Sequence, residues 1–309
     1  MSYPKLPYPI ESYTRGAQFA RLLGQRIMIL DGAMGTMIQR YKLSESDFRG
    51  TRFIGHGKDV KGNNELLSLT RPDVIREIHE QYLEAGSDVI ETNTFGANYA
   101  NLGEYEITER IYELAEAGAR IARECADKWS TPDRPRWVLG SVGPGTKLPS
   151  LGHAPYALLR DAYQEQVRGL IDGGADAILI ETSQDLLQAK AALVGARRAL
   201  TVAGIDLPVI AQVTVETTGT MLLGSEIGAA LNALEPLNID LIGLNCATGP
   251  AEMSEHLRVL SKNSTAKISV MPNAGLPILG PNGAVYPLSP DELAKYLSDF
   301  VDQYGISLI

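Results

Sequence analysis

The sequence is poor in cysteine: Cys125 and Cys246 are the only two among its 309 residues. Two cysteines cannot build the disulfide framework of a secreted scaffold, which indicates a reduced, cytoplasmic protein. Long apolar runs are also missing, because no stretch approaches the roughly 18–20 residues that a membrane-spanning helix needs. The first fifteen residues are rich in proline and tyrosine and lack the apolar core of a signal peptide. The sequence therefore predicts neither membrane association nor secretion.

An excess of basic residues is missing as well. The 28 lysines and arginines are outnumbered by 37 aspartates and glutamates, which gives a formal net charge of −9. Proteins that bind a phosphate backbone use clustered positive charge to release its counterions. The charge balance therefore argues against a nucleic-acid partner.

The sequence does contain short apolar, β-branched runs that alternate with longer segments of helical period. Runs that are apolar nearly throughout are typical of parallel strands covered on both faces. Eight of them, separated by helical segments, indicate an α/β fold in which βαβ units close into a (β/α)8 TIM barrel. The alternative is an open doubly wound sheet, but no Gly-x-Gly-x-x-Gly turn follows the first run. The expected strands are residues 27–31, 88–92, 137–141, 177–182, 209–213, 241–246, 267–271 and 306–309.

Several segments between these runs carry helix signals. Ser289-Pro290-Asp291-Glu292 combines a hydroxyl N-cap, a proline at the first helical position and a glutamate at the capping-box position. Apolar residues between Ile107 and Cys125 recur with a period near 3.6, which predicts an amphipathic helix. Thr70 followed by Pro72 and Asp73 indicates a further helix start.

The expected organisation is an N-terminal extension over residues 1–26 followed by one barrel domain over residues 27–309. The eighth run reaches Ile309, the last residue, and no crossover helix follows it. A complete barrel has a helix after each strand. We therefore expect the barrel domain to be incomplete at its C-terminal end.

Polar residues at the ends of the expected strands are the candidates for chemistry, because barrel active sites lie at the carboxyl ends of the strands. Asp31 ends the first run and precedes the turn Gly32-Ala33-Met34-Gly35. Backbone N–H groups in such a turn can face an anion, and an aspartate beside them can accept an ammonium group. The turn therefore suits the head group of an α-amino acid. An Asp-Gly turn without a ligand is the alternative.

Two further strand ends carry reactive groups. Glu181 follows a fully apolar run and could share the ammonium with Asp31, act as an acid or base, or form a structural ion pair. Cys246 follows Gly243-Leu244-Asn245 at another strand end, where a nucleophile or a metal ligand is expected. Its chemistry stays open from spacing alone, because catalytic zinc needs three protein ligands and a nucleophile needs a base. The four histidines fit neither requirement by spacing.

Taken together, six motifs resemble the homocysteine-binding domain of the cobalamin-dependent methionine synthase family. The resemblance extends from about Ile27 to Ile309, and the order of the motifs along the chain makes it specific. The motifs are Leu30-Asp31-Gly32-Ala33-Met34-Gly35-Thr36, Lys61-Gly62-Asn63-Asn64, Ile90-Glu91-Thr92-Asn93-Thr94-Phe95, Leu179-Ile180-Glu181-Thr182, Gly243-Leu244-Asn245-Cys246 and Met271-Pro272-Asn273-Ala274-Gly275-Leu276-Pro277.

The resemblance implies a zinc ion that activates the thiol of homocysteine for methyl transfer from methylcobalamin, giving methionine. Cys246 matches the first of three cysteine ligands, and the other two are expected beyond Ile309; Asn273 is implied to approach the zinc when substrate is absent. Folate-binding and cobalamin-binding domains or chains are the implied partners. The implied substrate-binding residues are Asp31, Gly32, Ala33, Met34, Gly35, Thr92, Glu181 and Asn273.

Other functions remain open at this stage. A stand-alone homocysteine methyltransferase using S-methylmethionine or betaine would share the zinc chemistry. A non-catalytic amino-acid-binding barrel would keep Asp31 and Glu181 but need no metal. A metal-free lyase or aldolase would need a base or a Schiff-base lysine at a strand end, whereas Lys267 lies at the start of its strand.

Overall fold

Seven parallel strands form one curled sheet in the computed structural model, which describes residues 14–276, 278–280 and 283–309. Their order in the sheet is β1-β2-β3-β4-β5-β6-β9, so consecutive strands are neighbours throughout. Seven of the eight expected runs match these strands to within one residue at each end, which confirms the parallel α/β barrel. The strands are β1 (Val89–Glu91), β2 (Trp137–Val142), β3 (Ala177–Ser183), β4 (Val209–Val213), β5 (Leu241–Asn245), β6 (Lys267–Met271) and β9 (Ile306–Leu308).

The remaining expected run, residues 27–31, is the first in the chain and forms only two isolated bridges, but it closes the ring and is called the closing segment below. Met28 pairs with Leu308 of β9, and Leu30 pairs with Val89 of β1, both in parallel. Side chains alternate here: Met28 and Leu30 are buried, whereas Ile27 and Ile29 are 37% and 50% exposed. The segment thus joins the first and last strands of the sheet, and its outward face stays uncovered by the described residues.

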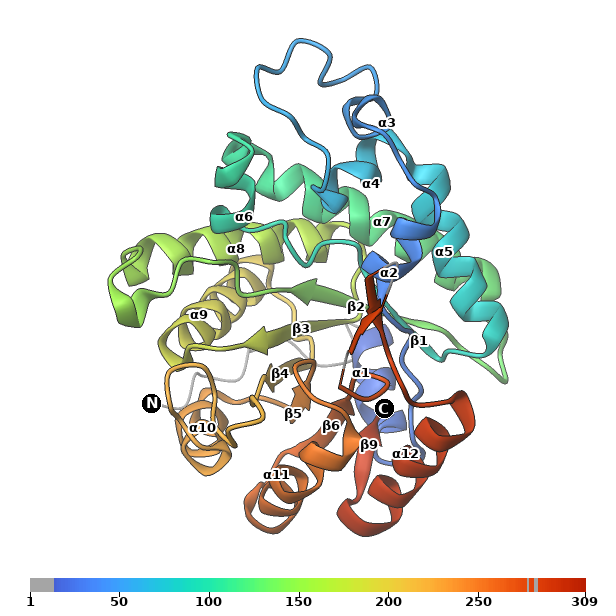
Figure 1. The fold of residues 1–309 in the computed structure, drawn as a ribbon, viewed down its shortest axis with the longest axis vertical. Coiled ribbons are helices and arrows are strands. Elements are labelled where there is room, and N and C mark those ends of the chain that lie inside the picture. Colours follow the sequence, from blue (N-terminus) through green and yellow to red (C-terminus); the bar gives the residue numbers. More distant parts are fainter. Residues whose placement is uncertain (1–13, 277, 281–282) are drawn as a thin grey trace.

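Helices surround the strands in chain order, as the colours in Figure 1 show. Short helical elements within residues 34–70, together with a long loop, lie between the closing segment and the helix that begins at Pro72. The helices are α1 (Thr14–Leu22), α2 (Met34–Arg40), α3 (Glu45–Arg49), α4 (Leu67–Thr70), α5 (Pro72–Ala85), α6 (Tyr99–Glu104), α7 (Ile111–Trp129), α8 (Tyr156–Asp172), α9 (Leu186–Ala203), α10 (Ile227–Leu234), α11 (Pro250–Asn263) and α12 (Pro290–Tyr304), with single 3₁₀ turns η2 (Asn64–Leu66), η3 (Thr108–Arg110), η4 (Pro149–Leu151) and η5 (Glu235–Leu237).

The helix signals of the sequence are confirmed. Ser289 caps α12 in a capping box, with its side chain accepting from Glu292 N and the Glu292 carboxylate accepting from Ser289 N. Pro72 occupies the first turn of α5, where its missing N–H costs nothing. The amphipathic helix expected between Ile107 and Cys125 begins at Ile111, because residues 108–110 form the tighter turn η3.

The barrel interior is apolar in its amino-terminal part. Leu139, Leu179, Ile210 and Leu241 point inward from successive strands and are fully buried. Phe19 of α1 joins the same cluster, and its ring centroid lies 5.8 Å from that of Trp137 at the start of β2. Helix α1, which lies within the expected N-terminal extension, therefore packs against the amino-terminal end of the barrel core.

The many prolines and glycines of segment 272–287 are typical of a long loop, but the segment contains a short antiparallel hairpin. Its strands are β7 (Ile278–Gly280) and β8 (Gly283–Val285). Residues 277, 281 and 282 lie outside the described residues. The hairpin was missed because the glycines and prolines around it mask two short apolar runs. It lies after β6, at the carboxyl end of the barrel.

Candidate functional site

A polar layer covers the apolar interior at the carboxyl ends of the strands. Successive inward-facing positions lie two residues apart in a strand, so the residue two places after each core residue also faces the interior. These positions bear polar side chains in neighbouring strands, in contrast to the apolar residues below them. The layer consists of Glu91 on β1, Ser141 on β2, Glu181 on β3 and Gln212 on β4, each two places after a core residue, together with Asn245, four places after Leu241 on β5, and Ser269 on β6.

Asp31 lies where the closing segment meets β1. Both of its carboxylate oxygens accept from the backbone N–H of Glu91, at 3.1 Å each, and the residue is 7% exposed. Burial raises the pKa of Asp31 well above its usual range, the Glu91 N–H opposes this rise, and the nearby charge of Glu181 adds to it. The sequence-predicted aspartate is therefore a desolvated carboxyl group that a cation would stabilise.

The turn after Asp31 leads directly into α2. Ala33 is the N-cap, and Met34 and Gly35 begin the helix, whose first N–H groups have no partner within the helix. Gly32 has no room for a side chain, because a Cβ there would lie 2.9 Å from the Tyr82 hydroxyl oxygen. Residues 32–35 thus follow Asp31 as a turn into a helix start, and their contact with the carboxylate of a ligand stays a prediction.

Glu181 is held by donors from three strand ends. Its Oε1 accepts from Ser141 Oγ at 2.5 Å, and its Oε2 accepts from Asn245 Nδ2 at 3.2 Å and from Thr182 Oγ1 at 3.4 Å. Burial raises the pKa of Glu181, while hydrogen bonds from Ser141, Glu91 and Thr182 hold it down. This network fixes the carboxylate in a site that is only 7% exposed.

Glu91 lies in the same cluster, and the sequence interpretation included it in the motif Ile90–Phe95 without giving it a role. Its Oε1 atom is buried and has no hydrogen-bond donor among the described residues. Burial, and then the charges of Glu181 and Asp31, raise the pKa of Glu91 well above its usual range. A signal was available, because Ile90-Glu91-Thr92 repeats the tripeptide Ile180-Glu181-Thr182 at the end of another strand.

Thr92 lies beside this cluster and contacts the neighbouring strand. Its hydroxyl accepts from the backbone N–H of Ser141 at 3.0 Å and lies 2.6 Å from Thr94 Oγ1. The Thr94 hydroxyl donates in turn to the carbonyl of Ser141 at 2.7 Å. Both threonines therefore hold the backbone of the serine that donates to Glu181, and a contact between Thr92 and substrate stays a prediction.

Cys246 follows β5 in a left-handed backbone conformation, with φ of +57°. Its Sγ lies 3.5 Å from Asn245 Nδ2 and 4.0 Å from Thr182 Oγ1, and Thr182 also has a positive φ, of +55°. A β-branched residue in this region is unusual and is found where the surrounding structure imposes it. Asn245 thus contacts both the Glu181 carboxylate and the Cys246 sulfur.

Asn273 lies in the loop after β6, next to the turn that follows Cys246. Its backbone N–H donates to the carbonyl of Thr248 at 3.1 Å, and the N–H of Cys246 donates to Met271 at 3.1 Å. The two loops therefore run side by side. This places Asn273 in the neighbourhood of Cys246, while any contact with a metal remains a prediction.

The residues present do not complete a metal site. Among the described residues, no group of three or more histidine, cysteine, aspartate or glutamate side chains has the arrangement that holds a metal ion. Cys246 is the only cysteine at the barrel mouth, because Cys125 is buried on α7. Zinc in a catalytic site takes three protein ligands, so this part of the chain supplies at most a fraction of the set.

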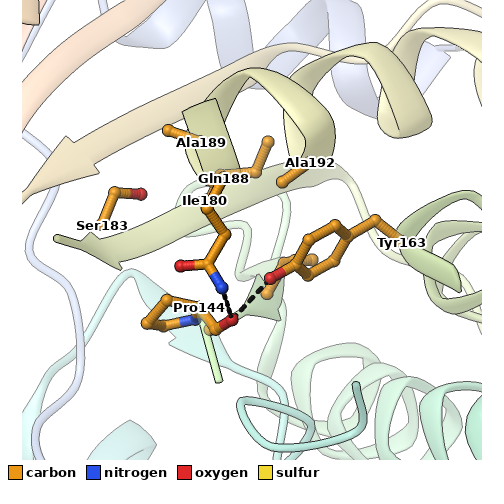
Figure 2. Close-up of a pocket in the computed structure, with 9 residues that line it drawn as sticks. Pro144, Tyr163, Ile180, Ser183, Gln188, Ala189 and Ala192 are labelled. Atoms are coloured by element: carbon orange, nitrogen blue, oxygen red, sulfur yellow. Dashed lines mark hydrogen bonds between the residues drawn. The ribbon is translucent and has the colours of Figure 1, made fainter. Parts of the chain in front are cut away.

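The loop between β2 and α8 is fixed from beneath by two side chains (Figure 2). The Pro144 carbonyl accepts from the Tyr163 hydroxyl at 2.6 Å and from Gln188 Nε2 at 2.5 Å. The hollow around these groups, between strands β2 and β3 and helices α8 and α9, has no room for a water molecule. Tyr163 and Gln188 therefore support the loop beside the site, and the hollow around them is not a ligand site.

Large apolar side chains are exposed in the loops that follow the strands. They occur after β1, β2, β3, β4 and β6, at the same end of the barrel as the carboxyl cluster. These mouth residues are Phe95, Leu151, Leu187, Leu222, Leu223, Leu276, Ile278, Val285 and Tyr286.

Comparisons with known proteins agree with this architecture. A family model described as homocysteine S-methyltransferase matches residues 28–309. The chain is 61% identical over 288 residues to a methionine synthase of Mycobacterium tuberculosis and 60% identical over 287 residues to one of Mycobacterium leprae. These matches cover 93% of this chain and 23% of each relative, so the chain spans about a quarter of the length of the curated relatives.

Solved structures show the same fold. The homocysteine methyltransferase MmuM from Escherichia coli, in its metallated form, superposes with a TM-score of 0.72 at 20% identity, covering 94% of this chain and 92% of that one. Its oxidized form gives a TM-score of 0.70 at 21% identity, with the same coverage.

No helix in the described part of the chain is long and apolar enough to cross a membrane.

Proposed function

The chain belongs to the homocysteine S-methyltransferase family, and from this premise we propose that it binds homocysteine and presents the sulfur for methylation to methionine. The observation that carries the proposal is the carboxyl cluster beside Cys246. Asp31 and Glu181 are buried at the barrel mouth, and no basic side chain among the described residues forms an ion pair with either. Desolvated carboxylates without a cationic partner favour a cationic ligand. The α-ammonium group of an amino acid supplies that charge.

The arrangement also orients the ligand. With its ammonium group between Asp31 and Glu181, the amino acid can direct its carboxylate to the backbone N–H groups of residues 32–35, where the turn enters α2. Asn245 contacts Glu181 and Cys246 at once, so the side chain of the ligand has a short path from the carboxyl cluster to the cysteine. The sulfur of homocysteine would lie at the Cys246 end of this path.

We assign Cys246 as one zinc ligand, with the other ligands to come from outside the described residues. Zinc, when bound, supplies the chemistry that a free thiol lacks, because only the thiolate attacks a methyl group and a thiol pKa is near 8.5. Burial raises the pKa of the Cys246 thiol, and the Glu181 charge adds to the rise. A cysteine in this environment needs a cation beside it to act as a thiolate. The contribution of the described residues is to bind and orient the amino acid.

The methyl donor in this proposal is methylcobalamin, presented by another domain or chain. The curated relatives are about four times as long as this chain, which leaves room for cobalamin- and folate-binding modules. The apolar mouth residues offer a surface on which a donor module can close and exclude water. A stand-alone enzyme that uses S-methylmethionine or betaine is the second candidate, and supplying each donor with homocysteine in turn separates the two.

Binding of homocysteine tests the first step. We expect isothermal titration to detect binding to the 309-residue chain, and Asp31→Asn to weaken it at least about tenfold, because a charge-assisted hydrogen bond is lost. Asp133→Asn, which changes an exposed loop, is the matched control and should bind as the unchanged chain does. Equal binding by the unchanged chain and Asp31→Asn would contradict the assignment of the ammonium site.

Zinc stoichiometry, measured with and without homocysteine, tests the second step. The single cysteine at the mouth predicts well under one zinc per chain for this polypeptide, and no effect of Cys246→Ser on homocysteine binding in the absence of metal. About one zinc per chain, lost in Cys246→Ser, would show that other groups complete the site. Retention of one zinc by Cys246→Ser would refute the assignment of this ligand.

A further inference from the structure

We propose that Glu91 completes the ammonium site: its carboxyl group hydrogen-bonds to Glu181 through one oxygen and accepts an N–H of the substrate's primary ammonium through the other. This inference rests on the proposed function and assigns a third substrate-binding carboxyl group. It also specifies the ligand class, a primary amine. The observations that carry it are the position of Glu91, its contact with Glu181 and the buried oxygen that has no donor.

The position of Glu91 follows from the order of the strands in the sheet. Glu91 ends β1, which lies between the closing segment that bears Asp31 and strand β2. Its backbone N–H donates to Asp31, and its carboxyl group is in hydrogen-bonding contact with that of Glu181. Glu91 is therefore the link between the two carboxylates already assigned to the ammonium group.

The contact between two carboxyl groups requires a proton. Two carboxylates at hydrogen-bonding distance repel one another in a buried site, so one of the pair holds a proton and donates it to the other. Glu181 already accepts from Ser141, Asn245 and Thr182, which stabilises its ionised form. Glu91 has no such donors, so it is the protonated partner, and its carbonyl oxygen remains free to accept.

A primary ammonium group has three N–H donors. Asp31 and Glu181 can accept two of them, and the buried Oε1 of Glu91 has no donor of its own. A third acceptor at this place satisfies both the ligand and the protein, because a buried acceptor without a donor costs free energy. The site therefore offers one acceptor for each of the three N–H donors of an –NH₃⁺ group. An alkylated nitrogen has fewer N–H donors and would leave the carbonyl oxygen of Glu91 without a donor.

The test compares two variants of the whole chain with two ligands, L-homocysteine and its α-hydroxy analogue, 2-hydroxy-4-mercaptobutanoate. Glu91→Gln keeps a donor toward Glu181 and an acceptor toward the ammonium, so we expect it to bind homocysteine within about threefold of the unchanged chain. Glu91→Leu removes both, so we expect binding to weaken about tenfold or more. The hydroxy analogue lacks the ammonium group, so both variants should bind it as the unchanged chain does.

The outcomes distinguish the role of Glu91 from the proposed function. Equal binding of homocysteine by Glu91→Leu and the unchanged chain overturns the role of Glu91 and leaves the proposed function intact. Equal weakening of both ligands by Glu91→Leu shows a structural effect and also overturns it. Absence of homocysteine binding by the unchanged chain overturns the proposed function together with this inference. Urea unfolding of Glu91→Leu confirms that the variant is folded, and Glu91→Gln supplies a conservative variant if it is not.

Discussion

Ser141→Ala is the sharpest single test of how the polar layer supports the site. The serine hydroxyl donates to Glu181 Oε1 at 2.5 Å, and the residue is 1% exposed, so water cannot replace the lost donor. Hydrogen bonds to charged groups contribute about 1.5–3 kcal/mol. Since about 1.4 kcal/mol corresponds to a factor of ten, homocysteine should bind up to roughly 10- to 150-fold more weakly in the pH range where the variant has lost the ionised form of Glu181 and the unchanged chain keeps it. The loss falls on binding because an ammonium group needs Glu181 ionised.

The change should also shift the pH dependence of binding. The Ser141 hydrogen bond lowers the pKa of Glu181 against the rise that burial causes. Removing it raises this pKa further, so Glu181 becomes protonated at a higher pH as acid is added. The acidic limb of homocysteine binding in Ser141→Ala should therefore lie at higher pH than in the unchanged chain, and titration calorimetry between pH 5 and 8 measures both effects.

Ser87→Ala is the matched control. Ser87 is 6% exposed and precedes β1 at the opposite end of the barrel, so its replacement should leave homocysteine binding unchanged. Urea unfolding of both variants separates loss of binding from loss of folding. The reasoning is refuted if folded Ser141→Ala binds homocysteine within about twofold of the unchanged chain, or if Ser87→Ala weakens binding equally.

Three predictions concern stability and are measured by urea unfolding. Gly243→Ala should destabilise the barrel by about 1–3 kcal/mol, because a Cβ would overlap the backbone of β6. The control Gly228→Ala has open space in α10 and should stabilise the protein by about 0.5 kcal/mol. Unchanged stability of Gly243→Ala would contradict the close approach of the two strands. Burial lowers the pKa of His79 to about 3, and neither ring nitrogen has a partner among the described residues. His79→Leu should therefore raise the free energy of unfolding by about 1 kcal/mol or more at pH 7. Between about pH 6.5 and pH 3 the histidine of the unchanged chain takes up a proton only when unfolded, so the variant should lose less stability than the unchanged chain as the pH falls through this range. The same pH dependence of stability in both proteins would argue against a buried neutral ring. Phe19→Ala should cost about 3–5 kcal/mol if α1 is part of the barrel core, and the exposed control Val202→Ala should stay within about 0.5 kcal/mol.

The order of strands and helices, and the strand ends that carry the candidate residues, could be predicted from local sequence patterns. Apolar runs mark parallel strands because both faces of each strand are covered, and the Ser289 cap marks a helix start because its hydrogen bonds are local. Asp31, Glu181 and Cys246 were selected as candidates because every strand of a parallel barrel ends at the same mouth. Each of these signals lies within a few consecutive residues.

The tertiary structure alone decided which of these residues meet. Closure of the ring depends on Met28 pairing with Leu308, far along the chain, and the packing of Phe19 against Trp137 joins α1 to the core. Likewise, Glu91 meets Glu181 only because β1, β2 and β3 lie side by side in the sheet, and nothing within either tripeptide encodes that pairing. Register and closure arise from pairing between distant segments, so they depend on the whole ring of strands and not on the local sequence.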